Sequence, residues 1–76
     1  MKLDKILIES FGAKQDQLID SFSIFSFPEW DSMSHMFFIT KLEEDYEIVV
    51  SGEEIASMRT VGDIKKIILN RGKIVE

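Results

Sequence analysis

Apolar residues recur at helical spacing in the first stretch of the chain. Leu3, Ile6, Leu7 and Phe11 stand at offsets 0, +3, +4 and +8, which places them on one face of a helix. Gly12 follows directly, at the position where a helix usually stops. The pattern therefore predicts a helix from about Lys2 to Phe11.

The longest helical pattern extends from about Ser32 to Tyr46 and has two apolar faces. With about 100° of rotation per residue, each face gathers one set of side chains. The face expected to pack in the core contains Phe38, Ile39, Leu42 and Tyr46. The nearly opposite face contains Met33, Met36, Phe37 and Thr40. A domain of this size has little else with which to cover the second face, so we expect it to be exposed.

Two further helices are predicted after Val50. Ser51 is a suitable N-cap for a short helix over residues 53–58. Thr60, with Asp63 three residues later, resembles a capping box at the start of the last helix. Its buried face is expected to consist of Val61, Ile64, Ile67 and Ile68. Gly72 should end this helix, and the tail from Lys73 to Glu76 is expected to fray.

The segment between residues 12 and 31 has no sustained period, yet it is too apolar for a free linker. Its apolar residues are Leu18, Ile19, Phe22, Ile24, Phe25 and Phe27. We therefore expect a long loop held against the core, with a helical turn around residues 15–19. A loop of this length is unusual in a compact domain and indicates either a function or a mistaken element assignment.

These elements predict an all-α fold in a single domain, residues 1–76. The expected architecture is an antiparallel bundle of three longer helices and one short helix, with the long loop between the first and second helices. A chain of 76 residues has a small core and no second lobe with which to enclose a substrate. We therefore do not expect an enzyme.

Charge and composition limit the kinds of partner and binding site that we expect for this chain. The chain has 14 acidic and 9 basic residues and a formal net charge of −5, which disfavours nucleic acid and anionic membranes and favours partners with basic surfaces. There is no cysteine and only one histidine, so no disulfide and no metal site is expected. Asp4, Lys5 and Glu9 interrupt the first apolar residues, so the start of the chain is neither a signal peptide nor a membrane span, and we expect a cytoplasmic protein.

Ser32 is the candidate functional residue, because it stands at the start of the longest helix after the long loop. In its simplest interpretation, Asp31-Ser32 only caps that helix. His35 lies one turn away, which raises the possibility of a nucleophile and base. A hydrolase would also need an orienting group and an oxyanion hole, and the sequence offers donors for neither. We expect His35 to be half-buried and hydrogen-bonded to loop backbone, and Trp30 to anchor the loop.

The order of these motifs resembles the acyl carrier protein family over nearly the whole chain. The matching segments are Gly12-Ala13-Lys14-Gln15 after the first helix, Asp31-Ser32-Met33 at the second, Leu42-Glu43-Glu44-Asp45-Tyr46 at its end, and Thr60-Val61-Gly62-Asp63-Ile64 at the last. In that family, the serine of the Asp-Ser-Leu or Asp-Ser-Met motif receives 4'-phosphopantetheine from coenzyme A. The resemblance implies that Ser32 is the attachment site and that Asp31 belongs to its motif.

The resemblance also implies a role in fatty acid or polyketide biosynthesis or a related pathway. Acyl or aminoacyl groups would be carried as thioesters on the arm of a phosphoprotein, which we expect to be a monomer. Partners would be a phosphopantetheinyl transferase and acyl-activating, acyltransferase or condensing enzymes. Glu29 replaces a frequent glycine, and Trp30 precedes Asp31. This variation is associated with free-standing carriers of specialised pathways. The first helix also begins about one to two turns later than in typical fatty-acid carriers, and both departures argue against a housekeeping fatty-acid carrier.

The second helix is the expected partner-binding element. Its exposed apolar face would supply Met33, Met36 and Phe37, and Glu43 and Glu44 would form an acidic border, although these acids could equally be a solvated surface. Acidic residues at a helix C-terminus are slightly unfavourable, which suggests another use for them. The alternative function is an unmodified helical adaptor that binds a partner through the same apolar stripe.

Overall fold

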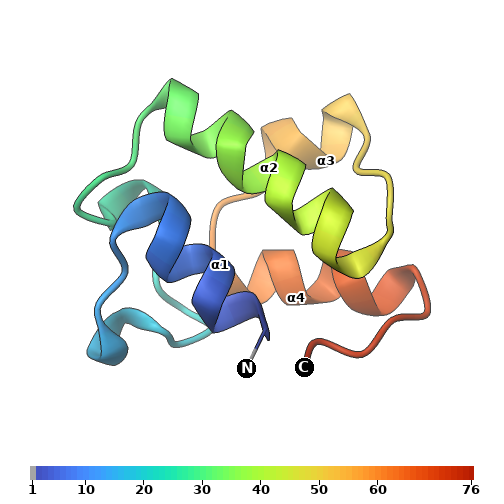
Figure 1. Cartoon of the computed structure of the whole chain (residues 1–76), viewed down its shortest axis with the longest axis horizontal. Helices are drawn as coiled ribbons and strands as arrows, with labels where there is room; N and C mark the ends of the chain where they lie inside the picture. Colours follow the sequence, from blue (N-terminus) through green and yellow to red (C-terminus); the bar gives the residue numbers. More distant parts are fainter. Residues whose placement is uncertain (1) are drawn as a thin grey trace.

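Four α-helices and two short 3₁₀ turns build the molecule, in a computed structural model that describes residues 2–76 (Figure 1). In chain order they are α1 (Lys2–Phe11), η1 (Gln15–Gln17), η2 (Ile24–Ser26), α2 (Ser32–Tyr46), α3 (Gly52–Ser57) and α4 (Val61–Asn70). Within the described part of the chain there is no strand, and Ser23 and Thr60 form one isolated antiparallel bridge. The predicted all-α fold, with three longer helices and one short helix, is confirmed.

The helices surround one hydrophobic core. α1 packs against α2 and runs in the opposite direction to both α2 and α4 (Figure 1). The side chains expected to face inward from these helices are all buried, including Leu3 and Phe11 of α1, Phe38 and Leu42 of α2, and Ile64 of α4. The helical phase derived from the sequence is therefore correct for each long helix.

Local sequence explains where the helices begin and end. Asp31, Ser51 and Thr60 are the N-caps of α2, α3 and α4, and each side chain accepts a hydrogen bond from the backbone N–H three residues later. Gly12 has a φ of +64° and donates its N–H to the carbonyl of Ile8, which closes α1 as glycine commonly does. The predicted cap positions are confirmed.

The long loop is fastened to the start of α4. Ile24 N–H donates to the Arg59 carbonyl at 2.9 Å, and Gly62 N–H donates to the Asp20 carbonyl at 2.9 Å. A Cβ atom at Gly62 would lie only 3.1 Å from that carbonyl oxygen, so glycine permits the close approach. Ile24 and Phe27 are buried as expected, whereas Ile19 and Phe25 are exposed, contrary to the expectation that the apolar loop residues face the core.

The C-terminal tail contacts the rest of the molecule through Val75. Val75 packs against the core, and the Tyr46 hydroxyl donates a hydrogen bond to the Val75 carbonyl. The sequence of the tail does not reveal this partner in α2. No helix within residues 2–76 has the length and apolar character needed to cross a membrane.

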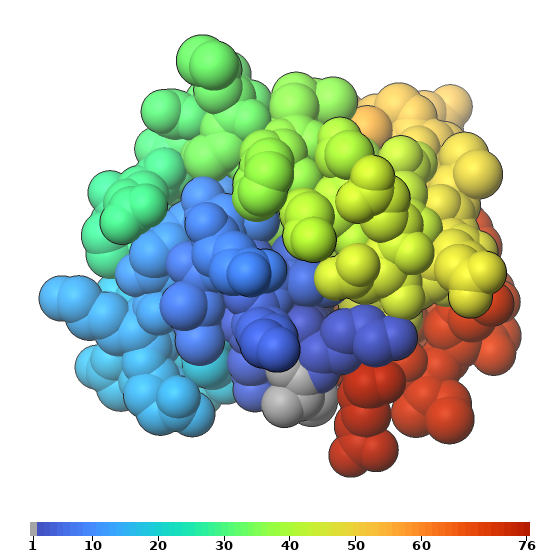
Figure 2. Space-filling view, in the orientation of Figure 1, coloured from blue at the N-terminus to red at the C-terminus, as the bar shows by residue number. Residues whose placement is uncertain are grey.

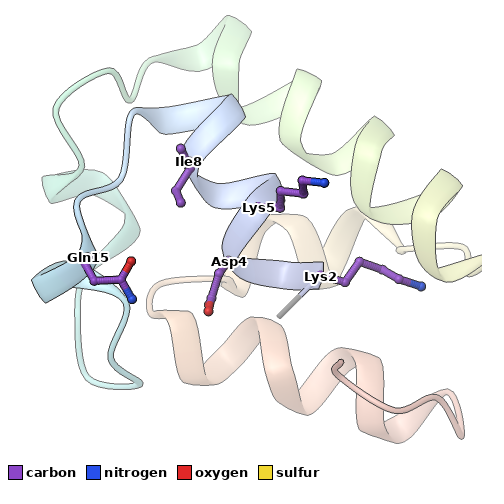
Figure 3. A pocket seen from close by; sticks show the side chains of 5 residues that line it. All are labelled: Lys2, Asp4, Lys5, Ile8 and Gln15. Carbon is purple, nitrogen blue, oxygen red and sulfur yellow. The ribbon is translucent and has the colours of Figure 1, made fainter.

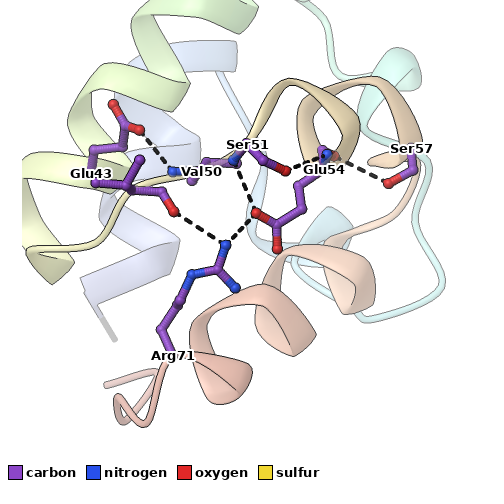
Figure 4. Close-up of polar contacts among 7 residues, drawn as sticks. Glu43, Val50, Ser51, Glu54, Ser57 and Arg71 are labelled. Atoms are coloured by element: carbon purple, nitrogen blue, oxygen red, sulfur yellow. Dashed lines mark hydrogen bonds and ion pairs between the residues drawn. The ribbon is translucent and has the colours of Figure 1, made fainter.

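α3 is held mainly by polar contacts (Figure 4). None of its residues is buried, and only Ile55 packs partly against the core. The Arg71 guanidinium, just after α4, pairs with the Glu54 carboxylate and also donates to the Val49 carbonyl at 3.2 Å. Through Arg71, the end of α4 is thus joined both to α3 and to the segment between α2 and α3.

Candidate functional site

Ser32 is the first residue of α2, and this end of the helix lies at the periphery of the ribbon in Figure 1. Its side chain is exposed, and within residues 2–76 its hydroxyl has no hydrogen-bond partner. A serine at this position is close to the unpaired N–H groups and the positive dipole end of the helix. The hydroxyl is thus accessible to another protein and lies where an attached anion is favoured.

Asp31 and Ser34 together cap α2 and leave Ser32 out of the cap. Asp31 Oδ1 accepts the Ser34 N–H at 2.7 Å, and Ser34 Oγ accepts the Asp31 N–H at 2.8 Å. The Ser34 N–H bond is the largest cause of the lowered pKa of the Asp31 carboxyl. Asp31 therefore remains ionised while its charge is directed at the helix backbone. Ser34 is not among the residues predicted from the sequence, although its spacing from Asp31 is that of a capping box.

His35 and Trp30 meet directly behind the site. The Trp30 indole Nε1–H donates to His35 Nδ1 at 3.0 Å, and the two rings are nearly perpendicular. The expected histidine partner in the loop backbone is therefore wrong, since the partner is an indole side chain. His35 is only 8% exposed, and this burial lowers its pKa. Trp30 packs against the core, as expected of a loop anchor.

Ser32 and His35 do not form a catalytic pair in this arrangement. Within the described residues, Ser32 has no hydrogen bond to His35, and the imidazole Nδ1 is already occupied by Trp30. The other ring nitrogen, Nε2, is buried and has no protein partner in residues 2–76. A general base must reach the proton of its nucleophile, and this ring faces the interior.

The apolar face of α2 is exposed as predicted. Met33 is 83% exposed, Met36 52% and Phe37 49%, so these three residues form what we call the apolar stripe. Phe25, in the preceding loop, is a further exposed ring and makes an edge contact with Trp30 at 4.9 Å between ring centroids. The sequence alone assigned Phe25 to the core, because nothing in its pattern distinguishes it from Phe27. Figure 2 shows that the first turns of α2 and the preceding loop, in green, project at one end of the molecule.

The two acidic residues proposed for the border differ from each other. Glu43 Oε2 accepts the backbone N–H of Val50 at 2.8 Å and so stabilises the turn after α2. Glu44 is exposed and has no such contact in the described part of the chain. Only Glu44 is therefore fully available to a partner.

Negative charge is concentrated around α2. Six acidic residues and one lysine occur between positions 29 and 47, whereas the other eight acidic and eight basic residues cancel. The whole net charge of −5 thus belongs to the segment that contains Ser32 and the apolar stripe. Such a field favours basic surfaces.

Two surface hollows occur elsewhere. One, of about 650 Å³, lies beside α1 and is lined by Lys2, Asp4, Lys5, Ile8 and Gln15 (Figure 3). The other, of about 450 Å³, lies between the loop and α4 and includes Asp20, Thr60 and Lys65 among its lining residues. Neither hollow includes Ser32 among its lining residues. No family model matches the chain.

Proposed function

We propose that the protein is an acyl or aminoacyl carrier that bears 4'-phosphopantetheine on Ser32. The observation that supports this most directly is the state of the Ser32 hydroxyl, which is exposed and unpaired within residues 2–76 at the first position of a 15-residue helix. Asp31 and Ser34 perform the capping, so the fold does not require the hydroxyl of Ser32.

The surroundings of Ser32 suit a phosphodiester. The helix N-terminus favours negative charge, and the Asp31 carboxylate is engaged by the Ser34 N–H. When bound, the group would supply a terminal thiol for thioester chemistry, which this chain lacks because it has no cysteine. Asp31 caps the helix, and its carboxylate would also help to orient the transferase and its metal ion.

Attachment is a group transfer to the Ser32 oxygen. Ser32 Oγ forms a bond to phosphorus as the phosphoanhydride bond of coenzyme A breaks, and the nucleotide bisphosphate leaves. The transferase supplies the base that takes the hydroxyl proton, because His35 is turned to the interior and occupied by Trp30. All bond-making steps on the cargo belong to partner enzymes.

Partner enzymes would be recognised by α2. The apolar stripe of Met33, Met36 and Phe37 provides adaptable contacts, and the negative charge around α2 steers basic surfaces toward Ser32. The same stripe supports the second candidate function, an unmodified adaptor, because an exposed apolar patch is itself a common protein-binding feature.

Intact mass separates the two functions. The protein is incubated with coenzyme A and a broad-specificity phosphopantetheinyl transferase, and we expect the mass to increase by one phosphopantetheine. Ser32→Ala should gain nothing, and the control Ser21→Ala, which changes another exposed serine, should be modified as the wild type is. An unmodified wild type would favour the adaptor.

A further inference from the structure

The contact between Trp30 and His35 joins the end of the loop to the first turn of α2. The loop end is also fixed from the other side, since Glu29 N–H donates to the Phe11 carbonyl at 3.0 Å and Trp30 N–H to the Phe27 carbonyl at 3.2 Å. Trp30 is two residues before Ser32, and His35 is three residues after it. The indole–imidazole hydrogen bond therefore spans the segment that presents Ser32.

This hydrogen bond requires one particular form of the histidine. An indole N–H can only donate, so His35 Nδ1 must be unprotonated, and the proton of the neutral ring resides on Nε2. Protonation of Nδ1 would place one N–H group against another. The bond therefore exists only while the imidazole is neutral.

The surroundings of His35 favour that neutral form. From α1 the ring faces Phe11, at 6.4 Å between centroids, and from the loop it faces Trp30. The nearest acidic residues in the loop are directed elsewhere: Glu29 packs against Gly12, and Asp31 bonds the Ser34 N–H. In the described chain no charged side chain pairs with the imidazole, and burial lowers its pKa below the usual value of 6.5.

We propose that neutral His35 is a positioning residue for Ser32: by accepting the Trp30 indole N–H it holds the loop end in the conformation that the transferase recognises, and protonation of Nδ1 releases it. The carrier would then be acid-sensitive at its own attachment site. This inference rests on the proposed function for its enzymatic consequence, whereas the release of Trp30 can be observed without it.

Two nearly isosteric substitutions separate hydrogen bonding from packing. His35→Asn retains an acceptor oxygen near the position of Nδ1 and cannot titrate, whereas His35→Leu has a similar shape and no acceptor. Leucine is the better helix former and leaves no buried amide, so His35→Leu should melt at the higher temperature of the two. A role confined to stability therefore predicts that the leucine variant is the better substrate.

The positioning role predicts the reverse order in modification. At pH 7.5 the kcat/KM for transfer of phosphopantetheine to Ser32 should fall about five-fold in His35→Leu, the factor that corresponds to one net hydrogen bond, and remain within about two-fold of wild type in His35→Asn. Equal rates for the two variants, or a faster leucine variant, would overturn the proposal.

The single tryptophan reports the release directly. As the pH falls below 6.5, the Trp30 emission of the wild type should shift to longer wavelength with the midpoint at the His35 pKa, measured separately by the NMR signals of the imidazole. His35→Asn should show no such transition, and the ratio of wild-type to His35→Asn modification rates should fall over the same pH range. A wild-type emission that does not change while His35 titrates would show that the hydrogen bond to His35 does not hold Trp30 in place.

The outcomes distinguish this inference from the proposed function. If the wild type is never modified, the carrier function fails, and the fluorescence titration still decides whether His35 holds Trp30. If the wild type is modified and both variants match it at every pH, the carrier function stands and the positioning role is wrong.

Discussion

The carboxylate of Glu43 and the backbone N–H of Val50 are joined by a 2.8 Å hydrogen bond that fixes the chain as it leaves α2. Val50 is nearly buried, so its N–H would otherwise lack a partner. An acidic residue near a helix C-terminus is unfavourable toward the dipole, and this contact accounts for its presence there. Glu43 is thereby separated from its neighbour Glu44.

The first prediction follows from that difference. Glu43→Ala should lower the free energy of unfolding by about 1 to 3 kcal/mol, because the Val50 N–H loses its acceptor. Glu44→Ala is the matched control and should change stability by less than about 0.5 kcal/mol. Urea denaturation followed by circular dichroism measures both. Equal stabilities of the two variants would show that water replaces the Glu43 carboxylate without cost.

The second prediction concerns the two faces of α2. Phe38→Ala and Leu42→Ala should each destabilise the fold by roughly 2 to 5 kcal/mol, because both side chains are fully buried. Met33→Ala should have little effect, since that side chain is 83% exposed. Thermal melts of the three variants test this, and a lower melting temperature for Met33→Ala than for Leu42→Ala would contradict the helical phase.

The third prediction concerns recognition by the partner enzymes that the proposed carrier function requires. Phe37→Ala should slow transfer to or from a partner with little dependence on salt, because it removes an apolar anchor. Glu44→Lys should lower mainly the association rate, and this effect should fade as salt screens the charge. Stopped-flow kinetics at low and high ionic strength separate the two signatures. If neither variant differs from wild type, docking uses another face.

The fourth prediction concerns the pH dependence of α3. The Glu54 pKa is lowered, chiefly by the Ser51 N–H and then by Arg71. A lowered folded-state pKa means that Glu54 stabilises α3 fully above its ordinary value of 4.5 and loses this effect as the pH falls through the folded-state value. Amide hydrogen exchange in residues 52–57 should therefore speed up, after correction for intrinsic rates, as the solution becomes acidic.

A pair of variants tests the source of that behaviour. Glu54→Gln should give fast exchange in α3 at neutral pH and little further change in acid, whereas Glu53→Gln, on the same helix, should behave as wild type. None of the residues of α3 is buried, so apolar packing offers little compensation. Wild-type protection in Glu54→Gln would show that the carboxylate is not what holds α3.

The helices were predictable because each carries its own signals. The spacing of Leu3, Ile6 and Leu7 sets the phase of α1, and Gly12 ends it. The caps at Asp31, Ser51 and Thr60 are local too, since each bonds the N–H three residues ahead. The exposed position of Ser32 could also be predicted, because it follows from being the first residue after a capping aspartate.

The long loop was only partly predictable. Its attachment to the core followed from its apolar composition. Phe25 and Phe27 are chemically identical, however, and Phe25 is exposed whereas Phe27 is buried. Their environments depend on where Arg59, Val61 and Gly62 lie in space, because the loop is bonded to those backbone groups far along the chain. No periodicity within the loop encodes that arrangement.

The sequence by itself determined the four helices, the N-caps of α2, α3 and α4, the buried faces of the three long helices and the accessible serine at the start of α2. Only the tertiary structure decided the side-chain partners. Trp30 donates a hydrogen bond to His35, and Glu43 accepts one from the Val50 N–H. Arg71 pairs with Glu54 of α3, and Val75 packs against the core. The physical reason is the sequence separation over which each kind of interaction acts. Helix signals act over three or four residues, whereas side-chain partners are chosen by the geometry of packing once the helices have met.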